Sequence, residues 1–229
     1  MRQIFLDTET TGLEPSLGHR IIEIAAVEMI NRRFTGNHYH CYLNPDRDID
    51  AGAQQVHGIS AEFLQDKPRF KDVADEFIEY VDGAELIIHN APFDIGFLNH
   101  ELGMLARERI GHFCPSVIDT LKMAKELHPG QKNNLDALCR RYQVDNSART
   151  LHGALLDAEL LAEVYLALTR GQETLNIEME EVTVTSSMEQ GSAPRDLMIL
   201  QATPEELEVH RQYLEGLDKA VKGSCVWRN

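Results

Sequence analysis

The chain has 229 residues, of which 43% are apolar and 26% charged, a balance typical of a globular protein with one substantial core. Its formal net charge of −15 argues against a protein that holds nucleic acid by charge alone. No apolar run approaches the ~20 residues of a membrane span, and a strand begins the chain, so we expect neither a membrane helix nor a signal peptide. The cysteines are scattered, and we expect reduced thiols in a cytosolic protein: Cys41, Cys114, Cys139 and Cys225.

The first strand is predicted from I-F-L-D-T-E-T-T-G, which runs from Ile4 to Gly12. Its apolar start is typical of a central strand that is buried on both faces. Asp7 and Glu9 follow at an i, i+2 spacing, which places both carboxylates on one face. Like charges this close raise each other's pKa, and a cation between them relieves the repulsion. Oxygen ligands without Cys or His favour Mg²⁺ or Mn²⁺ over zinc, although two acids that simply meet solvent at a strand end remain an alternative.

Two more strands are predicted over 21–30 and 34–43, and the polar N-R-R between them favours a hairpin. His38 and His40 share one face of the third strand. They could bind a metal, but without a third ligand nearby an exposed pair is the favoured interpretation.

A second group of elements leads to another acid. Ser60 can cap a short helix, and the apolar stripe over 70–81 predicts a longer one. Leu86-Ile87-Ile88 predicts a buried strand, and H-N-A-P-F-D follows it. We expect Asn90 to cap the next helix, with Pro92 in its first turn. Asp94 then lies in that turn and faces the carboxyl end of the strand.

Three further helices are predicted over 117–127, 135–142 and 151–168, the second with Asn134 as its cap. The patterns thus give the order β-β-β-α-β-α-α-α. An antiparallel meander followed by a crossover into parallel pairing implies an α/β fold with a mixed sheet flanked by helices.

The chain changes character after Thr169. Residues 171–194 contain five acids and no Lys or Arg and lack periodicity, which predicts a flexible tether. Residues 197–202 are typical of a strand, and T-P-E-E at Thr203 predicts a helix start. We expect that helix to run to Lys222 and to stop at Gly223. A segment this small buries little by itself, so we expect it to fold against a partner or the main domain.

His152 and Asp157 are five residues apart, which is about 140° around a helix axis, so both cannot lie on one helical face. They can meet if His152 precedes the helix or lies in its frayed first turn. Asp157 stands among leucines that are typical of a packed helix face, and an acid at such a position requires an explanation. A surface or capping role is the simpler interpretation of His152 taken alone.

Together these residues form the series D-x-E, then D, then H-x-x-x-x-D, and this series resembles the DEDDh 3′→5′ exonucleases. The surrounding words resemble that family too: L-D-T-E-T-T-G, H-N-A-P-F-D and R-T-L-H-G-A-L-L-D-A. N-N-L-D-A-L-C-R-R-Y at 133–142 and the terminal G-S-C-V-W-R-N resemble the proofreading epsilon subunits of bacterial DNA polymerase III. The resemblance implies a ribonuclease-H-like mixed five-stranded sheet. It also implies three regions: an exonuclease domain (1–170), an acidic linker with a clamp-binding motif (171–194) and a polymerase-binding segment (195–229).

The resemblance implies two-metal-ion hydrolysis that removes mispaired 3′-terminal nucleotides and releases nucleoside 5′-monophosphates. The implied ligands of two Mg²⁺ or Mn²⁺ ions are Asp7, Glu9, Asp94 and Asp157. His152 is the implied general base, which together with these acids completes the catalytic set. The implied substrate contacts are Asp7, Glu9, Thr10, Thr11, Gly12, Leu13, His57 and Asp157. Structural roles remain open for two of them, since Gly12 can serve only the turn and His57 can serve only loop packing.

The implied partners are the polymerase catalytic (alpha) subunit through the C-terminal segment and the DNA 3′ end as substrate. Q-x-x-L-x-I at Gln172, Leu175 and Ile177 resembles the family's motif for a weak contact with the sliding clamp. A small accessory subunit on the nuclease domain is a further possibility, and the implied location is the bacterial cytoplasm, at the replisome. Tethering would supply DNA by effective concentration, which explains how an acidic exonuclease can find its substrate.

Two other functions fit parts of the sequence. An RNA-trimming or general DNA-repair exonuclease would use the same acids and histidine, but would not need the acidic tether and the structured tail. A polymerase-stabilising subunit without catalysis would keep the tail, but would not need all five matched residues.

Overall fold

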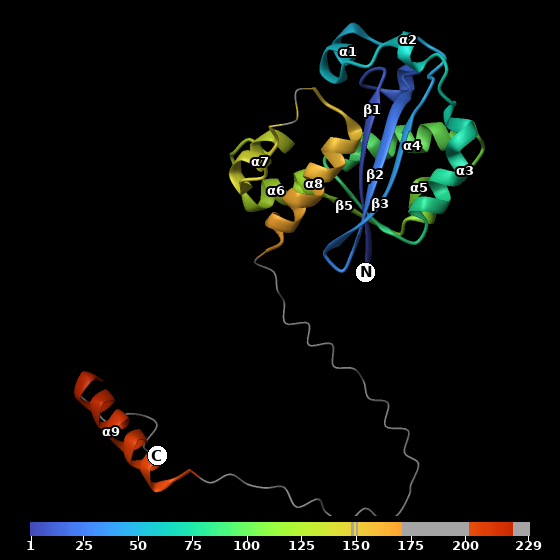
Figure 1. Cartoon of the computed structure of the whole chain (residues 1–229). Helices are drawn as coiled ribbons and strands as arrows, with labels where there is room; N and C mark the ends of the chain where they lie inside the picture. Colours follow the sequence, from blue (N-terminus) through green and yellow to red (C-terminus); the bar gives the residue numbers. More distant parts are fainter. Residues whose placement is uncertain (148, 150, 171–201, 222–229) are drawn as a thin grey trace, which may run out of the picture. The chain divides into compact units, whose positions relative to one another are not determined.

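The computed structural model describes residues 1–147, 149, 151–170 and 202–221. It divides into two units, Met1–Ile177 and Glu178–Asn229, which are described separately. Five strands of the first unit form one mixed sheet in the order β3-β2-β1-β4-β5 (Figure 1). The strands are β1 (Arg2–Thr10), β2 (Ile21–Ile30), β3 (Arg33–Tyr42), β4 (Glu85–Ile88) and β5 (Ser116–Asp119). The predicted mixed five-stranded sheet is confirmed.

β1 is the central strand, antiparallel to β2 and parallel to β4. Its side chains alternate between two cores, because successive residues of a strand point to opposite faces. Ile4 and Leu6 pack with α3 (Phe70–Val81), α4 (Ala91–Met104) and α5 (Ile110–Phe113). Phe5 packs with α6 (Thr120–Leu127), α7 (Leu135–Tyr142) and α8 (Ala154–Leu168). Helices therefore cover both faces of the sheet (Figure 1). By the same alternation, Asp7 and Glu9 share the face of Phe5.

The helices of the first unit cover the two faces and the end of the sheet. They are α1 (Ala51–His57), α2 (Ala61–Leu64), α3 (Phe70–Val81), α4 (Ala91–Met104), α5 (Ile110–Phe113), α6 (Thr120–Leu127), α7 (Leu135–Tyr142) and α8 (Ala154–Leu168), with a short 3₁₀ helix at Pro15–Leu17. The predicted helices over 70–81 and 135–142 are confirmed at both ends. The Ser60 and Asn134 side chains accept the expected capping hydrogen bonds.

Three expectations were wrong in part. Residues 117–127 are not one helix, because the first of them belong to β5, which pairs with β4, and the Asp119 side chain then caps α6. The helix expected over 151–168 begins only at Ala154, because Gly153 is extended. Asn90 precedes α4 but its side chain caps nothing. It adopts a left-handed conformation with φ 69°, and its backbone N–H donates to Asp119 Oδ1 at 3.1 Å.

His38 and His40 are both exposed on β3, as the favoured interpretation expects. His40 Nε2 also hydrogen-bonds Glu23 Oε1 at 2.7 Å. Glu23 lies on β2 opposite Glu9, so His40 contacts the acid that neighbours Glu9 in the sheet.

The described part of the second unit is α9 (Pro204–Val221). Its predicted start is confirmed, because Thr203 Oγ1 accepts from the Glu206 N–H at 3.3 Å and Glu206 Oε2 accepts from the Thr203 N–H at 2.8 Å. The predicted tether, residues 197–201 of the strand predicted over 197–202, and the helix end at Lys222 lie outside the described residues. Within those residues, no helix has the length and apolar composition needed to cross a membrane.

Candidate active site

Four acids converge where the central strand ends. β1 supplies Asp7 and Glu9, and the parallel β4 ends at the same edge of the sheet, so α4 begins there with Asp94 in its first turn. Asp157 lies in the first turn of α8. The positive end of a helix dipole favours an acid at each of these two positions. All four line one pocket of about 520 Å³, and His152 joins them there.

Asp94 is fixed by its neighbour on β1. It is 3% exposed, and the backbone N–H and hydroxyl of Thr8 both donate to its Oδ1, at 3.1 and 2.6 Å. Burial raises the pKa of Asp94 to about 7 even though the bonds from Thr8 act in the opposite direction. Without a counter-cation, this carboxyl group is therefore difficult to ionise.

The acids on β1 show the same electrostatic strain. Burial, followed by the charges of Asp94, Glu9 and Asp157, raises the pKa of Asp7 well above its usual range. Burial and the charges of Asp157 and Glu23 raise the pKa of Glu9 to about 8. A divalent cation would relieve this repulsion, and an all-carboxylate donor set suits Mg²⁺ or Mn²⁺. The residues present therefore fit such an ion.

His152 lies just before α8, so it can reach Asp157 without sharing a helical face with it. Its Nδ1 is 3.4 Å from Asp157 Oδ2, and its side chain is 46% exposed. One ligand atom from each of Glu9, His152 and Asp157 lies within 4.8 Å of the others. Asp7 and Asp94 line the same pocket but lie outside this closest group. The sequence-based placement of the histidine ahead of the helix is confirmed.

An arginine occupies the acid cluster as well. Arg149 donates from Nε to Asp157 Oδ1 at 2.5 Å and from Nη2 to Asp157 Oδ2 at 2.7 Å. Burial alone would raise the pKa of Asp157, but the neighbouring His152 ring and the hydrogen bonds and charge of Arg149 hold it below its usual range. Asp157 is thus the acid of the cluster whose ionised form a neighbouring cation stabilises.

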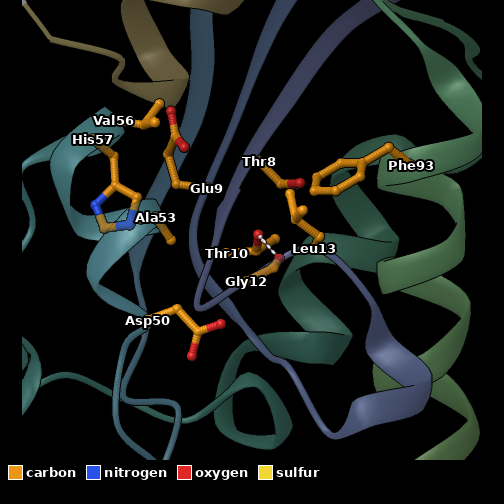
Figure 2. A pocket seen from close by; sticks show the side chains of 11 residues that line it. Thr8, Glu9, Thr10, Gly12, Leu13, Asp50, Ala53, Val56, His57 and Phe93 are labelled. Atoms are coloured by element: carbon orange, nitrogen blue, oxygen red, sulfur yellow. Dashed lines mark hydrogen bonds between the residues drawn. The ribbon is translucent and has the colours of Figure 1, made fainter.

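A second pocket of about 430 Å³ adjoins the acidic one, and the two share Thr8, Glu9, Leu13 and Phe93. Figure 2 shows it between the end of β1, the last turns of α1 around His57, and the Phe93 ring. Thr10, Gly12, Leu13 and His57 line it, and these are four of the residues that the family resemblance implies as substrate contacts. Thr11 does not. It is fully buried, and its hydroxyl lies 3.1 Å from His19 Nδ1.

The structure gives different answers for Gly12 and His57, whose structural roles the sequence leaves open. A Cβ atom at Gly12 would lie 2.3 Å from the His19 ring, so close packing by itself requires glycine here. His57 Nδ1 accepts from the Ile59 N–H at 3.0 Å, which leaves the ring proton on Nε2. Within the described structure that Nε2 is buried without a hydrogen-bond partner. His57 thus combines a loop-packing contact from Ile59 with a buried ring donor that makes no hydrogen bond.

The comparisons with known proteins agree with this geometry. A family model described as "Exonuclease" (RNase_T) matches residues 4–165. The chain belongs to the exonuclease family. Over 99% of its length it is 52% identical to "DNA polymerase III subunit epsilon" of Escherichia coli (strain K12), covering 97% of that protein. It is 49% identical to the protein of the same name from Rickettsia felis over 96% of its length, covering 98% of that protein.

Solved exonuclease structures share the fold. Exonuclease X in complex with 5′ overhanging duplex DNA is 28% identical with a TM-score of 0.58, covering 74% of this chain and 92% of that one. The nuclease domain of 3′hExo, a DEDDh family member bound to rAMP, has a TM-score of 0.64 at 17% identity. That match covers 75% of this chain and 92% of that one. At that identity the second match supports the fold alone.

Sequence reasoning missed three residues that shape this exonuclease site. Thr8 holds Asp94, and Glu23 accepts from the Ala154 N–H at 3.2 Å, which supports the start of α8. Arg149 binds Asp157. Thr8 and Arg149 stand inside the motif words, but only the alternation of β1 could have indicated that Thr8 faces α4. The predicted clamp-motif residues Gln172, Leu175 and Ile177 lie outside the described residues.

Proposed function

We propose that the chain is the proofreading 3′→5′ exonuclease subunit of a bacterial replicative DNA polymerase. It hydrolyses the terminal phosphodiester bond of a mispaired 3′ end. The observation that carries the proposal is the convergence of four carboxylates and His152 at the end of β1, beside a pocket of nucleotide size. Identity of about half, over nearly the whole length of proteins named as DNA polymerase III epsilon subunits, supports the proofreading role.

Asp7, Glu9, Asp94 and Asp157 would hold divalent metal, with two Mg²⁺ or Mn²⁺ ions as the proposed occupancy. When bound, these ions activate water and stabilise charge on the leaving 3′ oxygen. The chain positions the carboxylates before any ion arrives, since Thr8 fixes Asp94 and both helical acids lie at helix starts. Such pre-organisation lowers the reorganisation needed at the moment of reaction.

His152 would act as the general base. Its half-exposed ring lies beside Asp157, so it can take a proton from water at the pocket and release that proton to solvent. Asp157 Oδ2 lies 3.4 Å from His152 Nδ1, so it would help to orient the ring for this transfer.

The second pocket would receive the terminal nucleotide. Phe93 and Leu13 offer apolar surface to a base or sugar, and His57 Nε2 offers a donor. A mismatched end costs less to unpair than a paired one, so selectivity can come from the substrate and needs no reading of sequence. The acidity of the chain is compatible with this, because tethering would supply the DNA.

The proposed partners are the polymerase alpha subunit, which residues 195–229 would bind, and the sliding clamp, which Gln172, Leu175 and Ile177 would contact weakly. A small accessory subunit on the nuclease domain, and a location at the replisome in the bacterial cytoplasm, complete the proposal. The names of the relatives support a place in a polymerase complex, and the polymerase and clamp contacts rest on the sequence motifs of residues 171–229.

Digestion of a 5′-labelled primer tests the function directly. In Mg²⁺, the full chain should shorten a primer with a mismatched 3′ end faster than a paired one and release nucleoside 5′-monophosphates, and a chelator should stop it. Inactivity in both Mg²⁺ and Mn²⁺ would overturn the proposal in favour of a structural subunit. A preference for RNA ends would instead favour a trimming enzyme.

A further inference from the structure

All three nitrogens of the Arg149 guanidinium donate to acids. Two bond the two oxygens of Asp157, and Nη1 bonds Asp136 Oδ1 at 2.7 Å. Nη2 also lies 2.8 Å from His152 Nδ1. The Arg149 side chain is only 6% exposed, and burial at this level is unusual for arginine unless it is paired with acids.

These bonds conflict with the proposed chemistry. A metal held by Asp157 needs at least one of the oxygens that the guanidinium occupies. Because a guanidinium has no lone pair, its contact with His152 Nδ1 requires that nitrogen to accept, which engages a lone pair that a general base would need. In the described arrangement, Arg149 therefore competes with a metal ion for Asp157 and occupies a lone pair of His152.

We propose that Arg149 is a resident cation that holds the metal-free site together and must release Asp157 when the divalent ion binds. This inference rests on the proposed metal site. Asp136 on α7 gives the guanidinium an alternative partner, since its bond to Nη1 does not involve Asp157 and its side chain is 39% exposed. Arg149 thus competes with the metal, and its departure also frees the ring of His152.

The test variant is Arg149→Met, which keeps the length of the side chain and removes its charge and donors. Mn²⁺ binding is measured on the full chain by electron paramagnetic resonance, and melting is measured in chelator. The variant should melt at a lower temperature without metal, yet bind Mn²⁺ on the order of tenfold more tightly, because a charged hydrogen-bonded pair no longer opposes the ion. A merely structural arginine would give lower stability together with equal or weaker Mn²⁺ binding.

Arg2→Met is the matched control. Arg2 also donates to a carboxylate, Glu28 Oε1 at 2.6 Å, but at the opposite end of β1. This variant should melt at a lower temperature with Mn²⁺ affinity unchanged. A gain in Mn²⁺ affinity equal to that of Arg149→Met would show a general effect of net charge and would overturn the proposal.

Arg149→Lys provides a second variant, since it keeps the charge but cannot hold both Asp157 oxygens and Asp136 together. Its Mn²⁺ affinity should fall between those of wild type and Arg149→Met, and affinity equal to or weaker than wild type in every folded variant overturns the inference. In the wild type, the ¹⁵N-detected Arg149 Nε–H signal should move on addition of Mg²⁺, and a fixed signal at saturation contradicts release. If the wild type binds no Mn²⁺, the metal site and this inference both fail. If the wild type binds Mn²⁺ but no variant binds it more tightly, only the inference on Arg149 fails.

Discussion

The two ends of β1 differ in how they treat charge. At the N-terminal end, Arg2 donates to Glu28 at 2.6 Å, and Gln3 donates to Glu85 at 2.8 Å. Burial would raise the pKa of Glu28, but bonds from Arg2 and Thr35 hold it below its usual range. At the C-terminal end, burial and neighbouring acids raise the pKa of Glu9 to about 8.

β1 and β2 thus stabilise the ionised form of Glu28 at one end and destabilise the ionised form of Glu9 at the other. If stability alone determined the residues at an end of the strand, its acids would be paired with cations, as Glu28 is with Arg2. The excess of acids at the other end is tolerable because a cation can neutralise it, and Arg149 neutralises only part of it, at Asp157. The contrast indicates that function, and not packing, determines the residues at the carboxyl end of β1.

Neutralising the strained end should have the largest effect on activity. Asp7→Asn keeps the shape of the side chain and removes a proposed metal ligand worth several kcal/mol of charge stabilisation, so single-turnover digestion of a mismatched primer should slow by about 10³-fold or more. Removing an acid whose pKa is raised should also increase the melting temperature in chelator. Activity within tenfold of wild type would exclude Asp7 as a ligand. Glu28→Gln, at the paired end, should lower stability and leave digestion unchanged.

Removing the proposed base should have the next largest effect. His152→Gln should reduce kcat by about 10²-fold or more, the usual contribution of a general base, while Mn²⁺ still binds. His38→Gln is the control, because His38 lies exposed on β3, away from the pocket. Equal losses in both variants would contradict a specific role for His152, and so would a loss explained entirely by weaker metal binding.

The strained end should also determine how stability depends on pH. Glu9 and Asp94 have raised pKa values, about 8 and about 7, so the folded state binds more protons than the unfolded state between pH ~4 and 8, and stability falls as pH rises through this window. In chelator, the free energy of unfolding should therefore drop by more than about 1 kcal/mol from pH 5 to pH 8. Saturating Mn²⁺ should remove this slope. Urea titrations at each pH measure it, and a flat profile in chelator would show that these acids are not strained.

Much of this site could be predicted because its residues lie on regular elements. The alternation of β1 places Asp7 and Glu9 together, and five-residue spacing requires His152 to precede the helix that carries Asp157, as found. The local sequence pattern gave a wrong prediction at 117–127. β5 has only four residues there, and its strand character comes from pairing with β4. A stretch that short contains no period of its own.

Partnerships between distant segments were also beyond the sequence. Nothing in the pattern of β2 indicates that Glu23 supports the start of α8, 131 residues later. Arg149 stands in a recognisable motif, but its bonds to Asp157 and Asp136 depend on how α7 and α8 pack. Such contacts arise from tertiary structure, and residue spacing alone does not encode them.

The smallest effect is expected at the paired end of β1. Arg2→Met should cost about 1 kcal/mol of unfolding free energy at pH 7, because it removes a charged hydrogen bond to a largely buried acid. Since the pKa of Glu28 is lowered by folding, this contribution is present above pH ~4.5 and is lost as pH falls further. That slope is opposite to the one at the acidic end. Wild type and Arg2→Met should therefore converge in acid, while the chelator-dependent loss of stability near pH 8 stays the same in both. If Arg2→Met changed the alkaline slope instead, the two ends would be electrostatically coupled along β1, and the contrast between them would not hold.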